Sequence, residues 1–263
     1  MKYWQVTKNT WNESLTYRLN FIMWRVRVIL QFLTTYLLWA AILSSGKAIG
    51  FYNQNIMLGY VLGAWLLGTI VFSNRTQEIA EEINQGNLSN SLLKPFNYFF
   101  YWFFKDLGDK AMNVAFLSFE LTILFLILKP PIFIQHNIIL ILLTLFSLII
   151  AILLYFFINI LLSFIAFWSP ETWAPRFVFY TIIGFTAGEI FPLDILPKEI
   201  FSKLIYVPST YLIYFPLKIY LGEINYPQIF SGLLIASVWV ILFYLAVKLI
   251  WNHGLKLYTA QGR

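Results

Sequence analysis

Residues 138–167 read IILILLTLFSLIIAILLYFFINILLSFIAF and contain no charged side chain. A helix of about 20 apolar residues crosses the ~30 Å hydrocarbon core of a bilayer, so this run is long enough to cross with a tilt or to continue past the interface. Working outward from it, we find five further apolar runs, at about 26–43, 56–72, 111–128, 177–190 and 229–250. The sequence therefore predicts an all-α integral membrane protein with six transmembrane helices.

The composition of the 263-residue chain agrees with this prediction. Hydrophobic residues make up 60% and charged residues 11%, whereas a soluble domain carries about 25% charged residues. This excludes a soluble enzyme, a disordered tail and a nucleic-acid-binding module. The absence of cysteine excludes disulfides and thiolate metal sites, and two distant histidines make a histidine metal site unexpected.

The positive charges orient the predicted spans. With a cytoplasmic N-terminus, 13 of the 18 Lys and Arg residues fall in inner segments, as the positive-inside rule requires. The sequence predicts one membrane domain over residues 1–263, with both termini in the cytoplasm.

Three segments between the spans differ from ordinary loops. Residues 1–20 place Trp4, Trp11 and Leu15 on one helical stripe, which favours a helix in the cytoplasmic interface over a frayed polar leader. Residues 73–110 contain a short amphipathic helix and then an aromatic run, 96–104, which we expect at the membrane surface. Residues 191–228 are apolar but broken by five prolines, and predict short re-entrant helices packed on protein or lining a cavity.

Catalytic motifs are missing from the sequence. It contains no P-loop, no His-Glu-x-x-His and no Gly-x-Ser-x-Gly. Any ATP-driven role must therefore use an ATPase on another polypeptide.

Two acidic residues lie inside predicted spans, Glu120 near the middle of the third and Glu189 near the outer end of the fifth. A charge at the bilayer centre costs on the order of 2.5–3.5 kcal/mol on insertion scales. Each is either a proton or cationic-substrate site or a structural, protonated or hydrogen-bonded glutamate. Two small-xxx-small pairs, Gly59/Gly63 and Gly184/Gly188, predict close helix packing, either within the subunit or at a subunit interface.

Two ordered motifs resemble a known family. Residues 81–98, EEINQGNLSNSLLKPFNY, are similar to the cytoplasmic segment of ABC-2 type permeases, and residues 188–197, GEIFPLDILP, are similar to the outer segment after their fifth span. The closest resemblance is to a bacterial subfamily of roughly 260-residue, six-span permeases, and it covers essentially the whole chain.

The resemblance implies functional roles for both motifs. The coupling segment that contacts an ATPase would comprise Glu78, Ile79, Glu81, Glu82, Ile83, Gly86, Lys94 and Pro95. The extracellular gate would comprise Glu189, Phe191, Pro192, Leu193, Asp194 and Pro197, within an outer gate segment at 191–228. Glu120, Gly59, Gly63, Gly184 and Gly188 would serve either the translocation pathway or packing.

The resemblance also implies partners and a location. Two separate ABC ATPase subunits would bind ATP and Mg, and this chain would bind no cofactor itself. A second permease chain, identical or a sister, would complete a dimer. The dimer would lie in the lipid of the bacterial inner membrane. Such exporters carry drugs, lipids, peptides or other amphiphiles. One alternative is an ion-coupled secondary transporter or channel that uses Glu120; this alternative predicts an inverted repeat, which is not evident in the sequence. Another alternative is a lipid-modifying enzyme, for which no polar catalytic cluster can be assembled.

Overall fold

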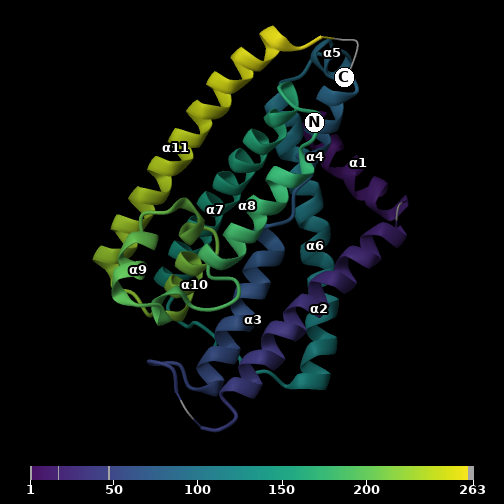
Figure 1. Ribbon diagram of the computed structural model, residues 1–263. Helices are drawn as coiled ribbons and strands as arrows, with labels where there is room; N and C mark the ends of the chain where they lie inside the picture. The colour runs from purple at the N-terminus through teal and green to yellow at the C-terminus, as the bar shows by residue number, and fades with distance from the viewer. Residues whose placement is uncertain (1, 17, 47, 260–263) are drawn as a thin grey trace.

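The computed structural model describes residues 2–16, 18–46 and 48–259, and this part of the chain forms a helical bundle with no β-strand beyond one isolated bridge (Figure 1). The predicted domain and leader include residues 1, 17, 47 and 260–263, which lie outside the described residues. Both ends of the chain lie at the same end of the bundle (Figure 1). We call this the cytoplasmic end, following the charge prediction, and the opposite one the outer end.

Within the described ranges, five helices are long and apolar enough to cross a membrane: α2 (Arg18–Ile42), α3 (Gln54–Val71), α6 (Tyr98–Leu128), α7 (Ile138–Phe164) and α11 (Tyr226–Leu257). A 3-10 turn, η1 (Ile165–Phe167), extends α7. Four of these helices begin at an asparagine N-cap: Asn53, Asn97, Asn137 and Asn225. An asparagine side chain satisfies backbone N–H groups that a helix start leaves unpaired, so these residues fix where each helix begins.

The predicted fifth span is shorter than the others. It is represented by α8 (Trp173–Thr186), whose 14 residues extend over about 21 Å at 1.5 Å per residue. Among the described helices, five are therefore long and apolar enough to be spans, compared with the six predicted from the sequence. Gly188, two residues beyond α8, has a φ of +80°, a left-handed conformation that turns the chain out of the helix.

The predicted surface run of aromatic residues is instead the first part of α6. The helix begins at Tyr98, after the Asn97 cap, and continues for 31 residues, or about 46 Å. Tyr98 and Trp102 are buried against α4 (Gln77–Asn84), α7 and α11 in one hydrophobic cluster. The run forms one helix with the third span, and this packing buries Tyr98 and Trp102, whereas Phe100 is 57% exposed.

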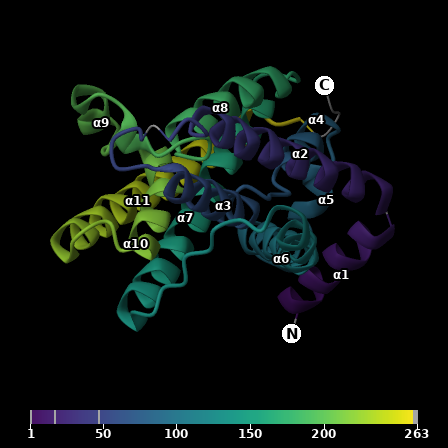
Figure 2. The same ribbon diagram turned by 90° about the horizontal axis from the view of Figure 1, so that it is seen from below.

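The predicted interfacial helix is present as α1 (Lys2–Thr16), and it packs along the first half of α6 (Figure 2). A Cβ on Gly108 of α6 would lie only 2.9 Å from the carbonyl oxygen of Thr7, so the glycine allows the two helices to touch. Thr7 donates a hydrogen bond to the Phe104 carbonyl at 3.0 Å. Trp4 and Leu15 are exposed on α1, as expected of a helix at a membrane surface.

The proline-rich outer segment forms four short pieces: η2 (Leu193–Ile195), α9 (Lys198–Leu204), η3 (Pro208–Tyr211) and α10 (Tyr214–Leu221). Residues 209–219 are buried, and α10 packs against α3 and α7. Residues 209–219 thus pack on protein, as expected, whereas α9 has no buried residue. Gly63 of α3 permits the contact, because a Cβ there would lie 2.6 Å from Leu217 Cδ1.

Candidate transport pathway

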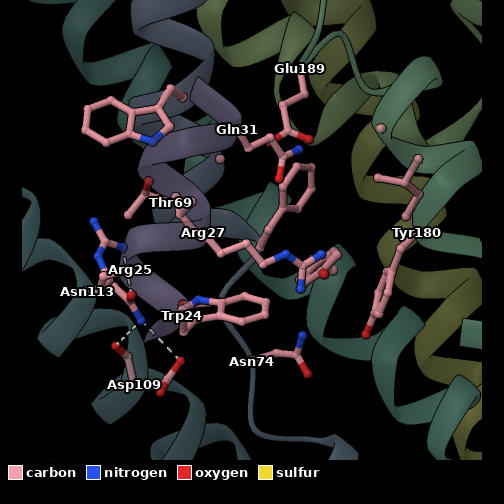
Figure 3. Close-up of a pocket in the computed structure, with 18 of the residues that line it drawn as sticks. Trp24, Arg25, Arg27, Gln31, Thr69, Asn74, Asp109, Asn113, Tyr180 and Glu189 are labelled. Atoms are coloured by element: carbon pink, nitrogen blue, oxygen red, sulfur yellow. Dashed lines mark hydrogen bonds between the residues drawn. The ribbon is translucent and has the colours of Figure 1, made fainter. Parts of the chain in front are cut away.

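A cavity of about 960 Å³ lies between α2, α3 and α8 and extends to α4 and the end of α1 (Figure 3). Glu189 and Asp109 lie at opposite ends of it, with Arg27 between them (Figure 3). Its walls combine aromatic rings, among them Trp24, Trp65 and Phe177, with polar groups such as Gln31, Thr69 and Asn74. Such a mixed wall suits a ligand with both apolar and polar parts.

Glu120 does not line this cavity; it forms a buried ion pair with Arg25, which does. Arg25 is 4% exposed and Glu120 6% exposed. Arg25 Nε donates to Glu120 Oε1 at 2.7 Å, and its Nη1 donates to Asn113 Oδ1 at 2.9 Å. The arrangement gives Glu120 a structural partner and connects α2 to α6.

Glu189 lies at the outer end of the cavity. Within the described residues its carboxylate has neither an ion pair nor a hydrogen bond. A Cβ on Gly68 would lie 3.5 Å from Glu189 Oε1, so this glycine of α3 leaves room for the carboxylate. Glu189 is therefore an acidic side chain at the cavity without a protein partner in this part of the chain.

The helix predicted to couple to an ATPase is α4, at the cytoplasmic end of the cavity. Ile79 and Ile83 are buried in the cluster that includes α6, α7 and α11. Glu82 accepts hydrogen bonds from Tyr98 at 2.8 Å and from Ser91 at 3.0 Å. The helix is therefore fixed to the bundle by both its apolar and its acidic face.

Charged residues extend this attachment from α4 to α6 and, through Lys105 of α6, to Glu13 of α1 at 3.6 Å. Glu78 pairs with Lys105 at 2.5 Å and with Arg75 at 3.5 Å, and Arg75 pairs with Asp109 at 2.9 Å. Asn113 donates to the Asp109 carbonyl at 2.9 Å and accepts from Arg25. The contacts therefore continue from Asp109 to the buried pair of Arg25 and Glu120. We call Glu78, Lys105, Arg75 and Asp109 the cytoplasmic network.

The rest of the predicted coupling segment lies on the surface. Glu81, Lys94 and Pro95 are exposed, and Leu93, just after α5 (Leu88–Leu92), is 84% exposed. Gly86 is buried at a φ of +74°, where it ends the helix. The structure thus separates the exposed Glu81, Lys94 and Pro95 from Glu78, Ile79, Glu82 and Ile83, which contact the bundle.

The predicted gate begins immediately after α8, and residues 187–195, which we call the closing segment, are held at the outer end of the cavity. Tyr60 of α3 donates to the Gly188 carbonyl at 2.8 Å, and the Trp39 indole of α2 donates to the Ile190 carbonyl at 2.8 Å. Leu193 is fully buried, Phe191 is half-buried and packs on the hydrophobic core, and Pro192 is buried. Asp194 contacts Tyr52 and Lys218, whereas Pro197 is exposed.

The predicted glycine pairs have different surroundings. Gly59 and Gly63 face other parts of this chain: Pro131 and Leu217, respectively. A Cβ on Gly188 would lie 2.8 Å from both Tyr214 Cβ and the Tyr60 hydroxyl, whereas one on Gly184, at the cavity, would meet nothing within 4 Å. Three of the four glycines therefore serve packing within the subunit.

Comparison with known families agrees with the resemblance carried by the two motifs. The family described as ABC-2 family transporter protein matches residues 29–262, nearly the whole chain. The chain belongs to this family. It is thus an ABC-2 transport protein with several apolar membrane-spanning helices. Among curated proteins, none matches the sequence.

Proposed function

We propose that the chain is the transmembrane permease subunit of an ABC exporter that moves an amphiphile with energy from separate ATPase subunits. The observation that carries this proposal is the cavity, which extends from the coupling helix α4 to the closing segment. A ligand in it would meet aromatic walls and a small number of polar groups. ATP and Mg would bind to the partner subunits.

The ATPase would dock on the exposed part of the coupling segment. Glu81 offers an exposed carboxylate, and Leu93 offers an apolar side chain of the kind that anchors an interface when it fills a pocket. Lys94 and Pro95 complete this surface. Glu78 and Glu82 have partners within the subunit, so their role would be to hold α4 in place rather than to contact the ATPase.

Movement would pass from the ATPases to the cavity through α4. The cytoplasmic network and the buried Ile79 and Ile83 fix this helix to α1, α6 and α7, so a push on α4 would shift these elements as a rigid body. The cavity walls α2, α3 and α8 would then rearrange, and the closing segment would open outward.

The complete transporter would contain two ATPase subunits and a second permease chain, identical or a sister. The exposed apolar faces of α2 and α8 border the cavity, and there they would face the second chain or lipid. Membrane lipids would contact α1 through Trp4 and Leu15. We place the transporter in a bacterial inner membrane with both termini in the cytoplasm.

Co-purification tests the proposed function. We expect the chain to purify with an ATPase encoded beside its gene, and Leu93→Asp combined with Glu81→Lys to weaken this association at least about tenfold, as for loss of an interface anchor. Glu199→Lys, which changes an exposed acid on the outer helix α9, should have no effect. The proposal fails if no ATPase co-purifies and transport is instead driven by a proton gradient and abolished by Glu120→Gln.

A further inference from the structure

Three segments far apart in the sequence meet at one lysine at the outer end of the molecule. Lys218 of α10 is 2% exposed. Its ammonium donates to Asp194 Oδ2 at 2.7 Å, to the Tyr52 hydroxyl and to Glu223 Oε2. Tyr52 lies between α2 and α3, Asp194 lies in the closing segment, and Glu223 follows α10. We call these four residues the outer cluster.

The outer cluster is arranged so that each acceptor depends on the same cation. The Tyr52 hydroxyl donates to Asp194 Oδ1 at 2.8 Å while it accepts from Lys218. Burial and the adjacent Asp194 carboxylate raise the pKa of Tyr52 well above its ordinary value, so the hydroxyl keeps its proton. The Lys218 ammonium also lies 4.9 Å from the centre of the Tyr52 ring and 5.5 Å from that of Tyr214. Removing the lysine would therefore detach Glu223 and break the ion pair of Asp194, leaving within the outer cluster the hydrogen bond between Tyr52 and Asp194.

Solvent reaches the acidic side of the outer cluster. The side chain of Asp194 is 29% exposed and that of Glu223 is 33% exposed, whereas that of Lys218 is 3% exposed. Breaking a dry ion pair leaves an uncompensated buried charge and is strongly unfavourable. A carboxylate that can regain water as it separates pays less of this cost, so these contacts can open and reform.

The outer cluster supplies the charged attachment of the closing segment. Among the described residues, the other polar contacts that hold this segment are neutral: Tyr60 to Gly188, Trp39 to Ile190, and the Tyr214 amide to the Ala187 carbonyl at 2.8 Å. A hydrogen bond to a charged group contributes more to stability than one between neutral groups. Asp194 is therefore the strongest single attachment point.

We propose that the outer cluster is a latch: Lys218 is a positioning residue that holds the closing segment over the cavity, and the segment opens outward when Asp194 leaves the lysine. This inference rests on the proposed function, because it treats the cavity as the pathway that the segment closes. Lys218, Asp194, Glu223 and Tyr52 would set how readily the outer end opens, without touching the substrate.

Cysteine labelling tests the latch directly, because the natural chain contains no cysteine. Thr35→Cys places a thiol on the cavity wall one helical turn from Trp39, which bonds the closing segment. A membrane-impermeant sulfonated maleimide, added to the outer side of membranes that hold the complete transporter without ATP, reports access past the segment. Ser45→Cys, in the exposed outer loop, confirms that the reagent is active.

We expect Thr35→Cys to react slowly in the otherwise natural chain. Lys218→Met should accelerate labelling on the order of 100-fold and Asp194→Asn about tenfold. The first effect is larger because Lys218→Met removes the buried cation, whereas Asp194→Asn removes one of its partly exposed partners. Lys203→Met, which removes an exposed lysine of α9, should change nothing.

Two results would overturn the latch: fast labelling of Thr35→Cys in the natural background, or slow labelling in folded Lys218→Met and Asp194→Asn variants. If Lys218→Met fails to fold, the partly exposed Asp194→Asn still decides the question. Co-purification of the ATPase with these variants separates failure of the latch from failure of the proposed function, since labelling without ATP does not require coupling.

Discussion

Both ends of the cavity are held by charges, but the cytoplasmic network and the outer cluster are built differently. The cytoplasmic network distributes its contacts over several cations and acids: Arg75 and Lys105 pair with Glu78, and Arg75 also pairs with Asp109. In the outer cluster a single cation, Lys218, serves two carboxylates and a tyrosine. Loss of one contact leaves the network connected, whereas loss of Lys218 removes both ion pairs of the outer cluster and leaves the Tyr52–Asp194 hydrogen bond.

This difference matches the movements that an exporter requires. A coupling helix must transmit a push, so redundant attachments to α1, α6 and α7 suit the cytoplasmic end. A gate must separate from its neighbours and return, which suits contacts that converge on one group and are partly reached by water. The following predictions break or sharpen this comparison, in order of decreasing effect.

Arg25→Met should have the largest effect on stability. It leaves Glu120 buried and unpaired, and we expect about 3–5 kcal/mol to be lost from the free energy of unfolding. Thermal unfolding of the purified protein measures the change. Arg27→Met is the matched control, because Arg27 lies two positions along α2, is exposed and stacks on Trp24; it should cost much less. Adding Glu120→Gln to Arg25→Met should recover part of the loss, and an absence of recovery would contradict the pairing.

Gly188→Ala should have a smaller effect, confined to the outer end. The left-handed backbone costs about 1–2 kcal/mol for a residue with a Cβ, and the new methyl group would meet Tyr214 and Tyr60. We expect lower stability together with faster outside labelling of Thr35→Cys. Gly184→Ala, four residues earlier, places its methyl in open space and should change neither measurement. Equal effects of the two substitutions would show that the closing segment is not held at Gly188.

Much of the fold could be predicted from local pattern. Apolar runs identified α2, α3, α7 and α11, and the prolines after residue 191 indicated short helices packed on protein. The length of α6 could not be predicted in this way, because the aromatic run before Lys105 is apolar enough for a membrane surface and only tertiary contacts bury Tyr98 and Trp102. For α8, the apolar pattern extended beyond the point where Gly188 turns the chain.

The charged residues of the candidate site were less predictable. Glu120 stands out as an acid in a span, but its partner Arg25 is 95 positions away, just before the first apolar run. Lys218 lies in the proline-rich outer segment and is the only Lys, Arg, Asp or Glu between Lys203 and Glu223. An isolated cation in an apolar segment was the available signal, but its partners come from segments that only the fold brings together.

The central claim, that ATP opens this cavity outward, can be tested by following the Thr35→Cys thiol in the natural background. Inverted membrane vesicles that hold the complete transporter would carry the impermeant maleimide inside, so that the reagent faces the outer end while ATP and Mg are added at the cytoplasmic end. We predict that labelling is slow without ATP, becomes at least about tenfold faster with it, and stays slow when the partner ATPase cannot bind ATP. Labelling that is the same with and without ATP, in a complex that hydrolyses ATP, would contradict the account.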